Sequence, residues 1–123
     1  MYTQRPQTSK QRWRTNMAHT QTISFTGLQD HGTDGEALAL QEIWAIIQAQ
    51  SFAEDALTSL NSIKTAVAEG TLTVERVYDN SAGTLTITRT WDDDAWTAHQ
   101  ASKLDNTAMA NALSSAGITV TGL

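Results

Sequence analysis

The clearest pattern in the chain is an alternation of apolar and polar residues in two arms, over residues 72–91. One side of the two arms consists of Leu72, Val74, Arg76, Tyr78, Leu85, Ile87, Arg89 and Trp91. A side-chain period of two predicts strands with one apolar face. Residues 79–83, with the sequence DNSAG, favour a tight turn between the arms. The segment is therefore predicted to be a β-hairpin.

Two shorter segments show the same alternation. Residues 20–26 (TQTISFT) place Gln21, Ile23 and Phe25 on one side and threonine or serine on the other. Residues 118–123 (ITVTGL) alternate in the same way near the end of the chain. Both are predicted to be strands.

Residues 34–69 have helical periodicity in two phases. The first apolar stripe, with i, i+3, i+4, i+7 spacing, is Leu40, Ile43, Trp44 and Ile47. Its continuation falls on polar residues, and a new stripe runs instead from Ala53 to Val67. Two helices joined near residues 50–51 explain this change of phase. One long kinked helix is the alternative.

The boundaries of these helices have their own signals. Thr33 with Glu36, and Ser51 with Glu54, have the spacing of capping boxes, in which each side chain bonds to the other's backbone donor. These pairs predict helix starts near residue 34 and at residue 51. Gly70 is suited to the left-handed residue that ends a helix.

Three aspartates, residues 92–94, follow the hairpin directly and precede a further helical segment. Their position favours an N-cap and an acidic first turn, with a metal site as the alternative. The helix is expected to be interrupted at residues 105–107, to resume over residues 108–116 and to end at Gly117.

The resulting order is strand, helix pair, strand, strand, helix, strand. This predicts an α+β protein with a ferredoxin-like βαββαβ antiparallel sheet and an enlarged helical first crossover. We expect a single α+β domain over residues 18–123, after a basic N-terminal arm at residues 1–17. One sheet face is expected to be covered by helices. The other is largely threonine and is suited to pairing with another copy.

Charge is distributed unevenly along the chain. Half of the eight basic residues are Arg5, Lys10, Arg12 and Arg14, and all thirteen acidic residues come later. A cationic segment on an acidic body is suited to an acidic partner. We expect these four residues to form a partner-binding arm, with nucleic acid binding and a simple polar tail as alternatives.

Composition excludes several classes of protein. The chain has no cysteine, so disulfides and thiolate metal sites are excluded. No apolar run reaches the roughly 20 residues of a membrane helix, so no membrane partner is expected. The charged N-terminal segment is not followed by the apolar region of a signal peptide, so we do not expect secretion by that route.

Candidate chemistry is sparse. His31 beside Asp30 and Asp34 suggests a loop metal site, although a surface loop explains the residues more simply. His99 is either a buried acid or base or a half-exposed helix residue. The sequence contains no nucleophile elbow, phosphate-binding loop or HExxH spacing. We therefore predict no catalytic residue, metal or cofactor, and interpret Arg76 and Arg89 as charges at a sheet surface.

The large apolar residues have two interpretations. Trp91 and Trp96 are expected to anchor the core, although tryptophans also line hydrophobic pockets. The stripe Leu40, Ile43, Trp44 and Ile47 is a candidate protein–protein interface, because one sheet face is not expected to bury both helical stripes. The alternative is that both stripes meet in one core.

The run GTLTITRTW at residues 83–91, followed by an acidic helix start and Trp96, resembles a pattern in small structural proteins of tailed phages. That resemblance implies a non-enzymatic assembly protein of a virion, acting as a homo-oligomer with other structural proteins, in the virion or host cytoplasm. The βαββαβ order also resembles dimeric α+β-barrel domains. These include cofactor-free monooxygenases that bind aromatic substrates between sheet and helices, so a small dimeric enzyme or ligand-binding protein is the alternative.

Overall fold

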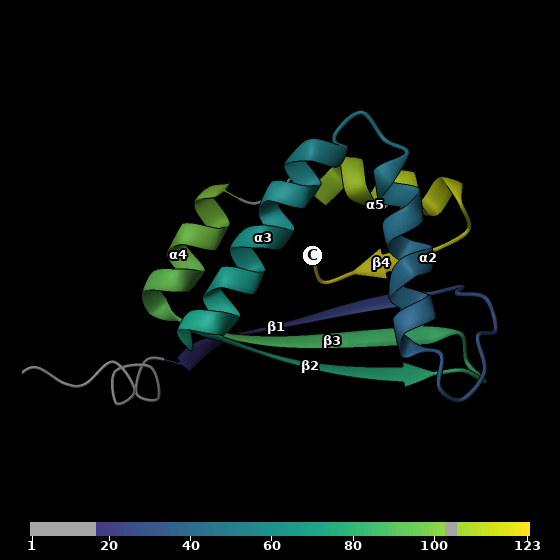
Figure 1. Ribbon diagram of the computed structural model, residues 1–123, viewed down its shortest axis with the longest axis horizontal. Coiled ribbons are helices and arrows are strands. Elements are labelled where there is room, and N and C mark those ends of the chain that lie inside the picture. The colour runs from purple at the N-terminus through teal and green to yellow at the C-terminus, as the bar shows by residue number, and fades with distance from the viewer. Residues whose placement is uncertain (1–16, 103–105) are drawn as a thin grey trace, which may run out of the picture.

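A computed structural model describes residues 17–102 and 106–123, and within them four helices lie on one face of an antiparallel four-stranded sheet (Figure 1). The strands are β1 (Met17–Thr26), β2 (Leu72–Asp79), β3 (Thr84–Asp92) and β4 (Thr119–Thr121). Their order is β2-β3-β1-β4, so β3 and β1 are central. The predicted α+β class is confirmed, while the ferredoxin-like assignment stays a prediction.

The predicted hairpin is confirmed. β2 and β3 pair along their whole length, and the turn between them ends at Gly83 with a φ of +67°. A Cβ at Gly83 would lie 2.8 Å from the carbonyl oxygen of Leu28. Glycine is therefore required here both by the left-handed backbone and by the close approach of the loop after β1.

The two faces of the sheet differ in chemistry. The helix-facing side carries the buried apolar residues Ile23, Phe25, Leu72, Leu85, Ile87 and Trp91. The opposite side of the two central strands carries Thr20, Thr22, Ser24, Thr26, Thr84, Thr86, Thr88 and Thr90. Successive side chains along a strand point to opposite faces of the sheet. Because the apolar residues face the helices, the threonine and serine residues between them face away from the helices.

The first crossover consists of α2 (Glu36–Gln48) and α3 (Ala53–Glu69), so two helices form rather than one kinked helix. Both predicted capping boxes are wrong, because the residues before the helices are Gly35 and Phe52 and neither helix has a side-chain cap. A backbone turn precedes α2 instead, in which the Gly35 N–H donates to the Gly32 carbonyl at 3.2 Å. A Cβ at Gly35 would lie 2.4 Å from the Cβ of His31, so this turn packs too closely for another residue.

The ends of the other helices follow the sequence signals more closely. α4 (Asp93–Ser102) starts where predicted, and Asp92 Oδ1 accepts a 2.8 Å hydrogen bond from the Ala95 N–H. α5 (Asn106–Ser115) begins after residues 103–105, which lie outside the described ranges. Gly70 ends α3 with a φ of +81°, and Gly117 follows α5 with a φ of +88°. The cap and both glycine predictions are confirmed.

The arrangement of the helices leaves space above the sheet. Figure 1 shows α2 and α3 close together at their connecting loop and diverging toward the sheet. α5 contacts α2 and β4, and α4 contacts β1 and β3. The helices contribute Ala39, Ile43, Ile47, Ala56 and Leu113 to the buried core. Because α2 and α3 diverge, only their side chains extend into the space between them. The size of those side chains determines how much of the space stays open.

Candidate ligand-binding cavity

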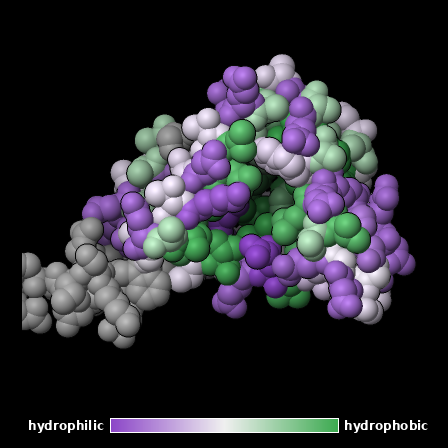
Figure 2. Space-filling model, in the orientation of Figure 1, coloured by the Kyte–Doolittle hydropathy of each residue, from purple (hydrophilic) through white to green (hydrophobic). Residues whose placement is uncertain are grey.

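A cavity of about 640 Å³ lies between the sheet and the helices. Figure 2 shows a hollow edged by hydrophobic residues on this face of the molecule, between α3 and α2. The apolar part of its wall comes from the sheet through Ile23, Phe25, Val74 and Ile87, and from α5 through Met109. Small-molecule sites in proteins have volumes of roughly 300–1,000 Å³, and their walls are mostly apolar. The cavity meets both criteria.

The two out-of-phase stripes of the first crossover both face this cavity. α2 contributes Leu40, Ile43, Trp44 and Ile47, and α3 contributes Ala56, Leu60, Ile63 and Val67. The four α2 residues are those expected to form a protein–protein interface. Ile43 and Ile47 are buried and the other two are half-buried, so the apolar surface that motivated that hypothesis faces inward. The interface itself stays a prediction.

Three polar residues on the sheet line the same cavity, and two of them, Gln21 and Arg89, are neighbours on the central strands. Gln21 on β1 lies opposite Arg89 on β3 in the strand register, and Val74 on β2 flanks Arg89 on the other side. The Gln21 side-chain amide donates to the Gly122 carbonyl at 3.2 Å, which leaves its Oε1 as the free end. Gln21 Oε1 and Arg89 Nε are both buried, and neither has a hydrogen-bond partner within the described part of the chain. A buried acceptor and a buried donor are therefore unsatisfied in the cavity wall.

The sequence indicated that Arg89 is a charge at a sheet surface, whereas the structure places its side chain in the wall of the cavity with a buried Nε. Its side chain is in phase with Ile87 and Trp91, so it lies on the helix-facing side and lines the cavity. Burial lowers the pKa of the Arg89 guanidinium, because desolvation disfavours the charged form. Arginine nevertheless keeps its proton in proteins, so Arg89 is a cation in a mostly apolar wall.

Arg76 has a different environment. It lies at the cavity from the edge strand β2, is exposed, and forms a 3.2 Å ion pair with Glu36 of α2. Such an exposed pair contributes little to stability. Its charge is already matched by a carboxylate.

An aromatic cluster lies at the opposite end of the sheet from the hairpin turn. Trp91 is 2% exposed, and its ring stacks on that of His99 with centroids 4.4 Å apart. Trp96 is half-buried and stacks on His19 at 5.3 Å, while His19 Nε2 lies 2.7 Å from Asp93 Oδ1. The structure thus brings together the two tryptophans expected to anchor the core. Their energetic contribution stays a prediction.

A second cavity, of about 480 Å³, adjoins this cluster. Trp91, Ala95 and His99 line it on one side, and Thr58, Ser62 and Ala66 of α3 line it on the other. Ser59, Ile63 and His99 contribute to the walls of both cavities, so the two are neighbours. His99, interpreted from sequence as either a buried acid or base or a half-exposed residue, is half-buried at this boundary.

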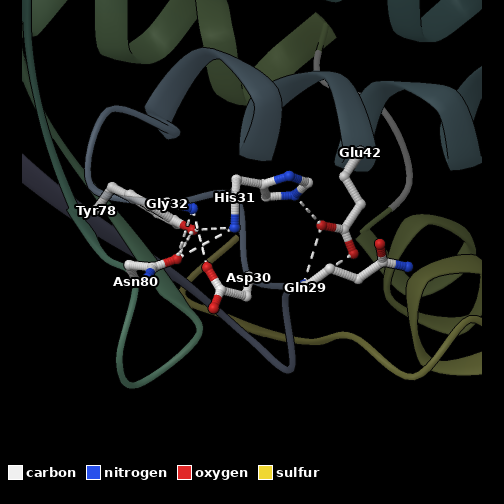
Figure 3. Close-up of polar contacts among 7 residues, drawn as sticks. All are labelled: Gln29, Asp30, His31, Gly32, Glu42, Tyr78 and Asn80. Carbon is white, nitrogen blue, oxygen red and sulfur yellow. Dashed lines mark hydrogen bonds and ion pairs between the residues drawn. The ribbon is translucent and has the colours of Figure 1, made fainter.

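The loop after β1 is held against the hairpin turn by a polar network (Figure 3). His31 Nε2 lies 2.6 Å from Glu42 Oε1 of α2, and the backbone N–H of His31 donates to Tyr78 Oη at 3.2 Å. Asn80 Oδ1 accepts hydrogen bonds from the backbone of His31 and Gly32 and from the Tyr78 hydroxyl. The network ties α2, through Glu42, to the loop after β1 and to Tyr78 of β2.

This loop does not form the metal site that the sequence suggested as one interpretation. His31 is paired with Glu42, whereas Asp30 accepts a 2.9 Å hydrogen bond from the backbone of Gly32. Within residues 17–102 and 106–123, no three His, Asp or Glu side chains gather closely enough to hold a metal ion. The predicted partner-binding residues Arg5, Lys10, Arg12 and Arg14 lie outside the described residues.

The chain has no significant match among protein-family models, among curated proteins or among solved structures. In the described ranges, no helix combines the length and the apolar character needed to cross a membrane. The cavity itself is therefore the main indication of function.

Proposed function

We propose that this protein binds a small, largely apolar molecule in the cavity between its sheet and its helices. The observation that supports this most strongly is the cavity of about 640 Å³ lined by apolar residues of α2, α3, α5 and three strands. The cavity opens at the surface between α3 and α2 (Figure 2), so its apolar wall is accessible to water. An apolar occupant would remove that surface from water, which is favourable.

The composition of the wall also supports binding. Ligand pockets combine many apolar side chains with a few polar groups that orient the ligand. Of the polar groups in this wall, Gln21 and Arg89 each have a buried atom without a hydrogen-bond partner among the described residues. Buried polar atoms are normally hydrogen-bonded, so a ligand group that pairs with these two atoms is favoured.

The strand order supports a related, finer proposal about the fold. Order β2-β3-β1-β4, with β1 and β3 central and helices on one face, is consistent with the ferredoxin-like type expected from the sequence. The alternative expected from that fold was a small ligand-binding protein or enzyme with its site between sheet and helices. The cavity lies in that position.

Titration of the full chain with Nile red, a neutral dye that fluoresces in apolar surroundings, tests the proposed function. We expect saturable binding of one dye per chain. Leu60→Trp should weaken binding by about tenfold or more, because the larger side chain occupies part of the cavity wall. Val77→Trp is the matched control, since Val77 is 67% exposed on the opposite sheet face.

Thermal unfolding of both variants verifies that they remain folded. Absence of saturable binding to the unmodified chain contradicts the proposal. Equal binding by a folded Leu60→Trp variant also contradicts it, because the dye would then lie elsewhere.

A further inference from the structure

Charge around the cavity is segregated by sign. Every lysine and arginine within the described residues, namely Lys64, Arg76 and Arg89, lines the cavity. None of the aspartate or glutamate side chains in the same ranges lines it, although acidic residues outnumber basic ones thirteen to eight in the whole chain. In an acidic protein, this clustering of basic side chains at one cavity favours the approach of an anion.

Among the described residues, Arg89 is the largely buried cation that lacks a counter-ion. Arg76 is paired with Glu36, and Lys64 is exposed to solvent on α3. Arg89 forms no ion pair among the described residues, and its Nε is buried without an acceptor. A desolvated cation without a partner is costly, and a carboxylate offers two oxygens that match the guanidinium fork.

Gln21 adds a second requirement. Its Nε2 is already used by the Gly122 carbonyl, so the buried Oε1 can only accept a hydrogen bond. An ionised carboxylate has no hydrogen to donate. A ligand that satisfies both residues therefore carries a hydroxyl or N–H donor next to its carboxylate.

We propose, on the basis of the binding function above, that the ligand is an amphipathic acid with an apolar chain or ring system and a carboxylate flanked by a hydroxyl or N–H donor. The carboxylate binds Arg89 and the donor binds Gln21 Oε1. The apolar part lies among Ile43, Ile63 and Met109. Lys64 attracts the anion from the rim, where salt screens its charge.

Calorimetric titration of the full chain with decanoate, 2-hydroxydecanoate, N-decanoylglycine and decan-1-ol tests this assignment. We expect the acids to bind about ten- to hundredfold more tightly than the alcohol, the range that a hydrogen bond to a charged group provides. The hydroxy acid or the acylglycine should bind more tightly than decanoate. Whichever of the two binds more tightly identifies the donor.

Variants assign these preferences to residues. Arg89→Met should abolish the preference for acid over alcohol, and Arg89→Lys should restore part of it, since lysine keeps the charge but not the fork. Gln21→Leu should remove only the advantage of the donor-bearing acids. Thr88→Met is the matched control and should retain the preference, because Thr88 is next to Arg89 in β3 but lies on the opposite side of the sheet, away from the cavity.

Two outcomes overturn the inference while the proposed function stands. In the first, Nile red binds but the unmodified chain does not distinguish decanoate from decan-1-ol. In the second, Arg89→Met retains the preference for acids. If neither Nile red nor any of the four compounds binds, the proposed function fails together with the inference.

Discussion

Replacement of Trp91 by alanine is expected to lower the free energy of unfolding by about 3–5 kcal/mol, the range for truncation of a buried large aromatic residue. Trp91 is 2% exposed, lies opposite Leu72 and His19 in the strand register, and stacks on His99 of α4. Its removal leaves a cavity where β3 joins α4. Urea denaturation followed by circular dichroism measures the loss.

Trp96→Ala is the matched control for this prediction. Trp96 lies in the same cluster but is half-buried, and its ring stacks on the partly exposed His19. Less apolar surface is removed from contact, so the loss should be clearly smaller. A Trp96→Ala variant less stable than Trp91→Ala would contradict this prediction. It would show that Trp96 of α4 contributes more to the stability of the cluster than Trp91 of β3.

Arg89→Met is expected to raise the free energy of unfolding of the ligand-free protein by about 1–3 kcal/mol, the cost of a buried polar group without a partner. Methionine keeps much of the side-chain volume and adapts to irregular apolar space. The pKa of Arg89 is lower in the folded state because of burial, so the protonated form opposes folding wherever it is charged. The gain should therefore be constant from about pH 5 to about pH 9, where arginine remains protonated.

Arg76→Met is the control for the stability measurement. Arg76 is exposed and paired with Glu36, so its replacement should change stability by at most about 1 kcal/mol. A loss of stability in Arg89→Met larger than that in Arg76→Met would mean that Arg89 has a structural partner. Arg89 would then no longer be free to hold a ligand.

Stability and binding are thus predicted to oppose one another at residue 89. Arg89 is expected to lower the stability of the ligand-free protein. Its presence is explained if a bound ligand pairs with its guanidinium group. The same variant that stabilises the empty chain should remove its preference for acids. Two independent measurements therefore bear on the same side chain.

Much of the fold was predictable from local sequence. The alternation over residues 72–91 determines the hairpin, because a period of two fixes which side chains share a face. The change of stripe between Ile47 and Ala53 predicted two helices. Gly70 marked the end of α3, and Asp92 marked the start of α4. The capping boxes failed because the start of α2 depends on packing against the loop around His31, which is a tertiary contact.

The cavity could not be predicted in the same way. The apolar stripes of α2 and α3 would be the same in sequence whether the two helices packed tightly together or diverged. Whether a cavity forms depends on how the helices are placed relative to each other, which the stripes do not specify. Arg89 carried a usable signal, since it is in phase with Leu85, Ile87 and Trp91. Arginine side chains are usually exposed, and the interpretation of Arg89 as a surface charge followed that tendency instead of the strand phase. The resemblance to phage structural proteins rests on residues 83–96, which lie outside most of the cavity wall, so it stays a separate prediction.

The most direct test of the binding account is nuclear magnetic resonance of the full chain, with ¹³C-labelled isoleucine methyl groups and saturating 2-hydroxydecanoate. We predict intermolecular nuclear Overhauser effects from the ligand chain to Ile43, Ile63 and Ile87, which line the cavity. Ile118 is the internal control, because it is buried in the core but does not line the cavity. Effects that are absent from the cavity isoleucines under saturating conditions would contradict the account.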